Sequence, residues 1–224
     1  MLRILGLTAA AVLMLGAANA SAQSFVFDFQ DGTDQGFGHK FGNDASETFP
    51  VVNIGGSLRM QVLRDGDFQE ADHGEGATGS NFYNTMLAAA DNEAGYQLSY
   101  DWYVDTANFG TGAGNFLQGG AYVNVGSGAY AQDFGAVKEF ELNGTQLASG
   151  QVFSGHVAVN MATAGLLMPS GETFFRLGLI INGDGAAQTV HYDNISVSPV
   201  PEPASLALLG LALPAIMLRR RGMA

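Results

Sequence analysis

Apolar and polar residues alternate in several short runs along the middle of the chain. The clearest run is 96–104, YQLSYDWYV, in which every second residue is apolar. A period of two is typical of a β-strand that buries one face. Trp102 shares the apolar face of this run with Leu98 and Val104, so we expect it in the core. Tyr103 falls on the opposite face, where we expect it to be exposed.

Similar short runs form further candidate strands, and no helical blocks alternate with them. These strands are 24–30, 57–63, 121–125, 137–141, 151–159, 173–181 and 188–197. The last two are separated by NGDG, whose Asn-Gly and Asp-Gly steps supply the positive φ angles of a tight turn, so we expect them to pair as a C-terminal hairpin. Residues 81–95 fit either one or two helical turns or a strand with a loop. Short strands at this spacing indicate an all-β fold, a β-sandwich.

The composition agrees with an all-β domain and restricts its partners. The chain holds 31 Gly, 15 Phe and 7 Tyr but no Cys, so aromatic side chains can fill pleated surfaces, glycines can form turns, and no disulfide contributes. We assign residues 23–199 to one sandwich domain. The net charge is −12 at pH 7, although four of the nine basic residues lie in the terminal segments. Such an acidic surface repels phosphate backbones, so we expect no nucleic-acid partner, whereas neutral sugars and divalent cations remain compatible.

The first 22 residues have the pattern of a secretory signal peptide. One early arginine precedes a short apolar stretch, which ends in small residues before a polar segment. Signal peptidase could cleave after Ala20 or after Ala22, and we favour Ala22. The alternative is a retained N-terminal helix anchor, for which the apolar stretch is short.

The last 25 residues, 200–224, contain a second apolar stretch. Residues 204–218 carry no charge, and as a helix they would be roughly 22 Å long, which is short for a hydrocarbon core of about 30 Å. Pro214 would distort the last turns of that helix, whereas Arg219, Arg220 and Arg221 would hold its end on the cytoplasmic side. These features favour a transient membrane segment over a permanent anchor.

Together these C-terminal parts resemble the PEP-CTERM sorting signal of Gram-negative bacteria. Val200, Pro201, Glu202 and Pro203 are followed directly by the apolar helix and the arginine cluster, in the order of that tripartite signal. The resemblance implies that exosortase, a membrane protease, recognises Pro201–Pro203. It also implies transient attachment to the inner membrane, followed by release to the outer surface or to an extracellular matrix rich in exopolysaccharide and associated with biofilm. The alternative is a chance Pro-Glu-Pro linker before a plain tail anchor.

Two stretches resemble bacterial jelly-roll domains that include many carbohydrate-binding modules. FDFQDGTDQGF, 27–37, is similar to their opening strand and turn, and YDNISV, 192–197, is similar to their closing strand. The resemblance implies a jelly-roll-like β-sandwich and a structural Ca²⁺ shared by the two strands, here at Gln30 and Asp193. Gln30 stands where these modules usually have glutamate, which removes one charge from that site. Alternatively, Asp31 and Asp193 shape turns or accept backbone hydrogen bonds.

The chain shows no recognised catalytic motif, so we expect it not to be an enzyme. It lacks a Gly-x-Ser-x-Gly elbow, a phosphate-binding loop and paired histidines at metal-ligand spacing. The acidic stretch 65–76 lacks the regular oxygen spacing of a calcium loop, so we expect it to form a solvated loop rather than a loose calcium site. Tyr103 is the candidate platform for stacking against a sugar. The leading hypothesis is a non-catalytic surface protein with a structural or polysaccharide-binding role; the alternative is an extracellular glycan hydrolase that uses a carboxylate pair.

Overall fold

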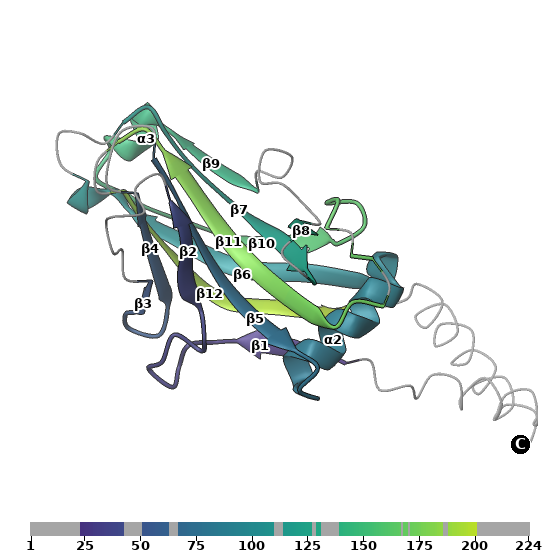
Figure 1. Cartoon of the computed structure of the whole chain (residues 1–224). Helices are drawn as coiled ribbons and strands as arrows, with labels where there is room; N and C mark the ends of the chain where they lie inside the picture. Colours follow the sequence, from purple (N-terminus) through teal and green to yellow (C-terminus); the bar gives the residue numbers. More distant parts are fainter. Residues whose placement is uncertain are drawn as a thin grey trace, which may run out of the picture.

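The chain folds into two antiparallel β-sheets that pack face to face (Figure 1). The computed structural model describes residues 23–42, 51–62, 67–109, 114–126, 129–130, 139–166, 168–169, 171–185 and 188–200. The first sheet has the order β10 (Val152–Asn160), β6 (Tyr96–Asp105), β12 (Gln188–Pro199), β4 (Leu58–Val62) and β3 (Val52–Asn53), and β1 (Phe25–Phe27) also pairs with β12. The second has the order β2 (Gly38–Gly42), β5 (Asp67–Gly76), β11 (Phe174–Gly183), β7 (Phe116–Val125) and β8 (Ala129–Tyr130), and β9 (Phe140–Asn143) also pairs with β7. The expected all-β sandwich is confirmed.

The facing sides of the two sheets enclose one apolar core. On β6, Leu98, Tyr100 and Val104 are fully buried, as the alternation in that run predicts. Trp102 is half-buried and stacks on Phe140 from the opposite sheet, with ring centroids 4.2 Å apart and planes inclined by 12°. The placement of Trp102 against the core is therefore confirmed.

The expected C-terminal hairpin is wrong, because β11 and β12 lie in different sheets. β11 pairs with β5 and β7, whereas β12 pairs with β1, β4 and β6. The Asp-Gly step after β11 serves another purpose: Asp184 accepts hydrogen bonds from the backbone N–H groups of Asn115 and Phe116 at the start of β7. The turn residues thus fix a crossover between sheets rather than a hairpin.

The expected acidic loop at 65–76 is also wrong, since most of it forms β5. This strand lies between β2 and β11, with Ala71 and the polar Gln69 buried on its inner side. Gln69 accepts a hydrogen bond from the backbone N–H of Gln61 on β4, 2.8 Å away. Because polar residues occupy inward positions of this strand, the sequence lacks the alternation of apolar and polar residues that would have predicted it.

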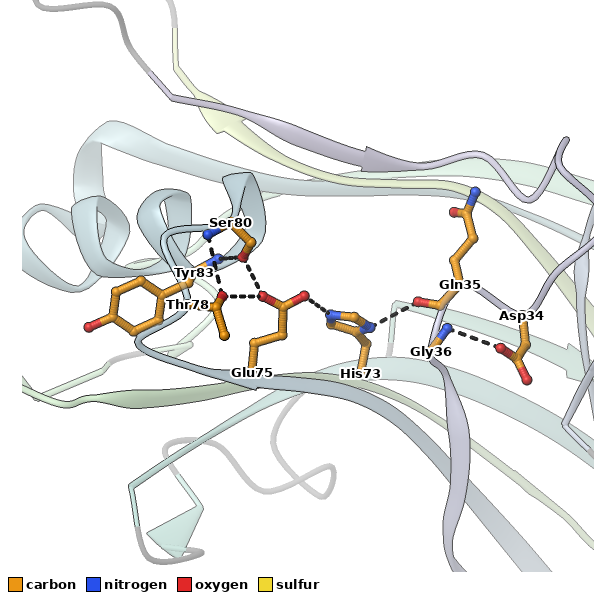
Figure 2. A network of polar contacts seen from close by, with 8 residues as sticks. All are labelled: Asp34, Gln35, Gly36, His73, Glu75, Thr78, Ser80 and Tyr83. Atoms are coloured by element: carbon orange, nitrogen blue, oxygen red, sulfur yellow. Dashed lines mark hydrogen bonds and ion pairs between the residues drawn. The ribbon is translucent and has the colours of Figure 1, made fainter.

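A helix, α2 (Asn81–Asp91), covers one end of the sandwich and settles the alternatives left open for 81–95 (Figure 1). Ser80 caps it, because its hydroxyl accepts a hydrogen bond from Tyr83 N at 3.0 Å. The same hydroxyl donates to the Glu75 carboxylate. Glu75 Oε1 also lies 3.0 Å from His73 Nε2, and His73 Nδ1 lies 2.9 Å from the carbonyl oxygen of Gln35 (Figure 2). This network ties the helix to β5 and to the turn after β1.

Between the sheets lies a second polar feature, centred on Glu139 directly before β9. Its Oε2 accepts a hydrogen bond from Ala121 N at 3.1 Å. Its Oε1 and the hydroxyls of Tyr100 and Tyr192 are buried without a hydrogen-bond partner in the part of the chain described. Burial raises the pKa of Glu139 to about 7. Burial also raises the pKa of both tyrosines, and the nearby Glu139 carboxyl group adds to that shift.

Candidate functional site

A cleft of about 460 Å³ lies on the outer side of the first sheet, where β6, β10 and β12 run side by side. The turn between β3 and β4 and the turn after β1 form its remaining walls. Its polar and aromatic lining includes Gln30, Ser57, Asp101, Tyr103, Ser154 and Asp193. Gln30, Tyr103 and Asp193, which the sequence nominated for different reasons, therefore meet in one cleft.

One wall is a tight two-residue turn that only glycine fits well. Gly55 and Gly56 both have positive φ angles, 63° and 84°, as the turn of a two-residue hairpin requires. Ile54 and Ser57 close the turn by exchanging backbone hydrogen bonds of 2.8 and 3.3 Å. The side-chain amide of Gln30 donates to the carbonyl oxygen of Gly56 at 3.2 Å, so the two walls are joined.

The aromatic part of the cleft is a stacked pair. Tyr103 is 36% exposed, and its ring lies on the His191 imidazole with centroids 4.3 Å apart and planes inclined by 13°. His191 Nδ1 lies 3.0 Å from Ser57 Oγ, and this hydrogen bond holds the imidazole ring in place. Burial, together with the charge of Arg59, lowers the pKa of His191 to about 4. The pair is therefore an uncharged, flat and rigid surface at neutral pH.

Two carboxylates face each other on the neighbouring strands. Asp101 on β6 and Asp193 on β12 are directly opposite in the register of the sheet. Burial acts to raise the pKa of Asp101, but hydrogen bonds from Asn194 and His156 outweigh it and hold the pKa below its ordinary value. Burial and the charges of Asp101 and Asp28 raise the pKa of Asp193. Asp101 is thus the fixed anion of the pair, and Asp193 is the group that takes up a proton more readily.

The predicted calcium ligands line the same cleft, but only Asp193 offers a charged oxygen. The amide nitrogen of Gln30 donates to the carbonyl oxygens of Asp28 and Gly56, at 3.0 and 3.2 Å. These bonds engage the nitrogen of the amide, so Gln30 could offer Ca²⁺ only its uncharged carbonyl oxygen. No group of three or more His, Asp or Glu side chains in the described part of the chain is arranged to hold a metal ion. The residues present do not fit the implied Ca²⁺ well, and calcium at Gln30 and Asp193 stays a prediction.

The cleft also contains residues that the sequence did not nominate. Asp101 alternates with Tyr103 on the exposed face of β6, so the pattern itself placed it there. His191 and the Gly55–Gly56 turn were missed because their roles depend on contacts between strands. Of the sorting residues, Val200 is described, whereas Pro201, Glu202, Pro203, Arg219, Arg220 and Arg221 lie outside the described residues, as do Ala20 and Ala22. Within the described ranges, no helix is both long and apolar enough to span a membrane.

Comparisons with known proteins bear on the tail and on the fold. Residues 199–221 match the family model described as the PEP-CTERM protein-sorting motif, which confirms the expected motif. No curated protein matches the chain. A carbohydrate-binding module specific for non-crystalline cellulose, of family 28, is similar in structure, with 13% identity, a TM-score of 0.47, and coverage of 75% of this chain and 90% of that one.

Two further solved structures are similar at the level of the fold. A family 27 module from Caldicellulosiruptor saccharolyticus, in complex with mannohexaose, has 16% identity and a TM-score of 0.42, covering 79% of this chain and 97% of that one. A family 11 module from Clostridium thermocellum, in complex with a mixed-linked tetrasaccharide, has 7% identity and a TM-score of 0.41, covering 80% and 96%. At these identities no ligand follows from the likeness. The described domain is an antiparallel β-sandwich that leads directly into a PEP-CTERM protein-sorting motif.

Proposed function

We propose that this chain is exported and processed by exosortase, and that its β-sandwich then binds polysaccharide at the cell surface or in the extracellular matrix without catalysing a reaction. The sorting motif at 199–221 supports the route. In this proposal signal peptidase removes residues 1–22, and the apolar segment 204–218 holds the protein transiently in the inner membrane of a Gram-negative bacterium.

The observation that carries the binding part is the partly exposed Tyr103, stacked on His191, in a cleft that also presents carboxylates. A flat aromatic surface packs well against the apolar face of a sugar ring. Asp101 and Asp193 can accept hydrogen bonds from sugar hydroxyls, and charged acceptors form the stronger bonds. An uncharged platform beside fixed acceptors suits a neutral polysaccharide, and the acidic net charge of the chain disfavours a polyanion.

Affinity electrophoresis of residues 23–199 in gels that contain soluble glucans, mannans, xylans or isolated exopolysaccharide tests this function. We expect one or more of these polymers to retard the domain, and Tyr103→Ala to reduce that retardation. Val152→Ala is the matched control, because Val152 on β10 is 65% exposed and does not line the cleft. Unchanged migration in every polymer would contradict polysaccharide binding and leave a structural role.

The opposed carboxylates favour a second candidate function, hydrolysis of an extracellular glycan. Two carboxyl groups whose pKa values are driven in opposite directions are the usual arrangement of acid and base in glycosidases. Here Asp193 would act as the acid and Asp101 as the base or nucleophile. Release of reducing sugar from the same polymers, abolished in both Asp193→Asn and Asp101→Asn, would support this alternative; a polymer that is bound but never shortened would exclude it.

A further inference from the structure

The sorting motif begins inside the folded sheet. The match starts at residue 199, and Pro199 is the last residue of β12. Pro199 is paired with Tyr96 on β6, and the backbone N–H of Val200 donates to the carbonyl oxygen of Gly95 at 2.8 Å. Only Pro201 therefore separates Glu202 from a residue that is held by the sandwich.

This arrangement leaves little chain between the folded domain and the membrane. Glu202 is two residues beyond Val200, so its Cα lies at most about 7 Å from that of Val200 even when the chain is fully extended. The apolar segment starts at Ala204, at most about 14 Å from Val200. Since the headgroup layer on one side of a bilayer is about 5–8 Å thick, the end of β12 must stand close to the membrane surface before processing.

A protease that also binds the residue before Pro201 competes with the sheet for the N–H of Val200. A backbone N–H is normally satisfied by one partner, so the N–H of Val200 cannot serve Gly95 and an enzyme at the same time. We propose that residues 198–200 must detach from β6 and from η1 (Glu93–Gly95) before the processing enzyme can bind Pro201–Pro203. The detachment of this strand end then limits the rate of processing. This inference rests on the proposed sorting function.

The structure indicates that β12 rather than η1 is the side that moves. The carbonyl oxygen of Ala94 accepts a hydrogen bond from Asn160 Nδ2 at 2.8 Å, and the Glu93 carboxylate accepts one from Met168 N at 3.3 Å. Gly95 lies so close to Asn92 that a Cβ there would come within 2.2 Å of the Asn92 amide. The turn that holds Val200 is therefore fixed from several directions.

The end of β12, in contrast, is weakly held. The register between β1 and β12 ends at Val197, so the pairing of Ser198 and Pro199 is with β6 alone. Pro199 has no N–H and cannot donate to the ladder. Strand ends of this kind open at a small fraction of the cost of global unfolding, which makes detachment a feasible step before cleavage.

A disulfide across the end of the strand tests the proposal in the full chain. Gln97 and Ser198 are directly opposite on β6 and β12, and the natural chain has no cysteine, so Gln97→Cys combined with Ser198→Cys introduces one unambiguous pair. Processing is followed by the mass of the product in membranes that contain the exosortase, with the pair oxidised or reduced. We expect the oxidised pair to slow processing about tenfold or more, reduction to restore it, and each single cysteine variant to behave as the natural chain.

A second variant tests the same step in the opposite direction. Ser198→Pro lies outside the matched motif and weakens the pairing of this strand end with Gln97, because proline has no N–H and fits poorly in a paired strand. We expect processing of this variant to become about threefold to tenfold faster, which corresponds to the loss of about one hydrogen bond. Processing of the oxidised pair at the natural rate would overturn the inference. Glu202→Ala separates the two proposals. If the Glu202→Ala variant is processed like the natural chain, the proposed sorting function is wrong. If this variant is not processed but the oxidised cysteine pair is processed at the natural rate, only the proposed detachment step is wrong.

Discussion

Tyr103 lies flat on His191, with ring centroids 4.3 Å apart, so that one aromatic side chain of β6 is supported by a second ring on β12. The two residues are directly opposite in the register of the sheet. Burial lowers the pKa of the half-buried His191 to about 4, so Tyr103 packs on a neutral ring and would expose it by turning away. This support holds a partly exposed tyrosine as the flat surface that the proposed function requires.

The first prediction concerns that surface. Tyr103→Ala removes the stacking partner of a sugar ring and is expected to lower polysaccharide affinity about tenfold, whereas Tyr103→Phe keeps the ring and most of the affinity. Isothermal titration calorimetry with the polymer that retards the domain measures both. Equal affinities for the natural domain and Tyr103→Ala would place the binding site elsewhere.

The second prediction concerns pH. Glu139 has its pKa raised to about 7 by burial, from about 4.5 in the unfolded chain. The native state therefore binds this proton more tightly, so the associated stability is complete below about pH 4.5 and is lost as the pH rises through about 7. A shift of this size corresponds to about 3 kcal/mol.

His191 has the opposite effect in the same range. Its pKa is lowered to about 4 from about 6.5, so the unfolded chain binds that proton more tightly and stability is lost as the pH falls from about 6.5 to 4. The Glu139→Gln variant lacks the loss of stability that Glu139 causes as the pH rises. Its free energy of unfolding should therefore increase from pH 4.5 to pH 7 by more than that of the natural domain. Urea denaturation at several pH values measures this difference, and parallel pH profiles for the two proteins would refute it.

The third prediction concerns the cap of α2. Ser80→Ala removes the acceptor for Tyr83 N and one donor to Glu75, and is expected to destabilise the domain by about 1 kcal/mol. Thr78→Ala is the control, since Thr78 also donates to Glu75, at 3.0 Å; its hydroxyl accepts a hydrogen bond from Ser80 N at 3.3 Å but none from Tyr83 N. Equal losses in the two variants would show that the cap itself contributes nothing.

The fourth prediction concerns Ca²⁺. Because the Gln30 amide presents its nitrogen to the carbonyl oxygens of Asp28 and Gly56, we expect millimolar Ca²⁺ to change the melting temperature of the natural domain little. Gln30→Glu supplies a carboxylate at the same place and should make the melting temperature rise with Ca²⁺, an effect that Asp193→Asn removes. A marked Ca²⁺-dependent rise in the natural domain, lost in Asp193→Asn, would instead confirm the calcium site expected from the sequence.

The alternation of side chains identified individual strands well. β6 was assigned correctly, with Tyr103 outward and Trp102 toward the core, because a two-residue period is a local property of the chain. Pairing between strands is not local. The Asn-Gly step forms the end of β11, and the Asp-Gly step that follows can either turn a hairpin or start a crossover. The hydrogen bonds from Asn115 and Phe116 to Asp184 decide between them.

The same limit applies to the cleft. Gln30, Tyr103 and Asp193 were each predicted from their own segment of the chain. They come together because β12, which carries Asp193, pairs with β1, which precedes Gln30, and with β6, which carries Tyr103. The support of Tyr103 by His191 arises only from that register. A single sequence can thus propose residues for a site but not their assembly.

Intrinsic fluorescence tests polysaccharide binding in the cleft most directly, because Trp102 is the only tryptophan of the chain and lies between Asp101 and Tyr103 on the strand that forms the cleft, with its ring stacked on Phe140 behind that strand. We predict that a polymer that retards residues 23–199 also changes the intensity or wavelength of Trp102 emission in a saturable manner, and that Tyr103→Ala shifts the midpoint of this titration to higher polymer concentration. Emission that stays constant up to polymer concentrations that fully retard the domain would contradict binding in this cleft.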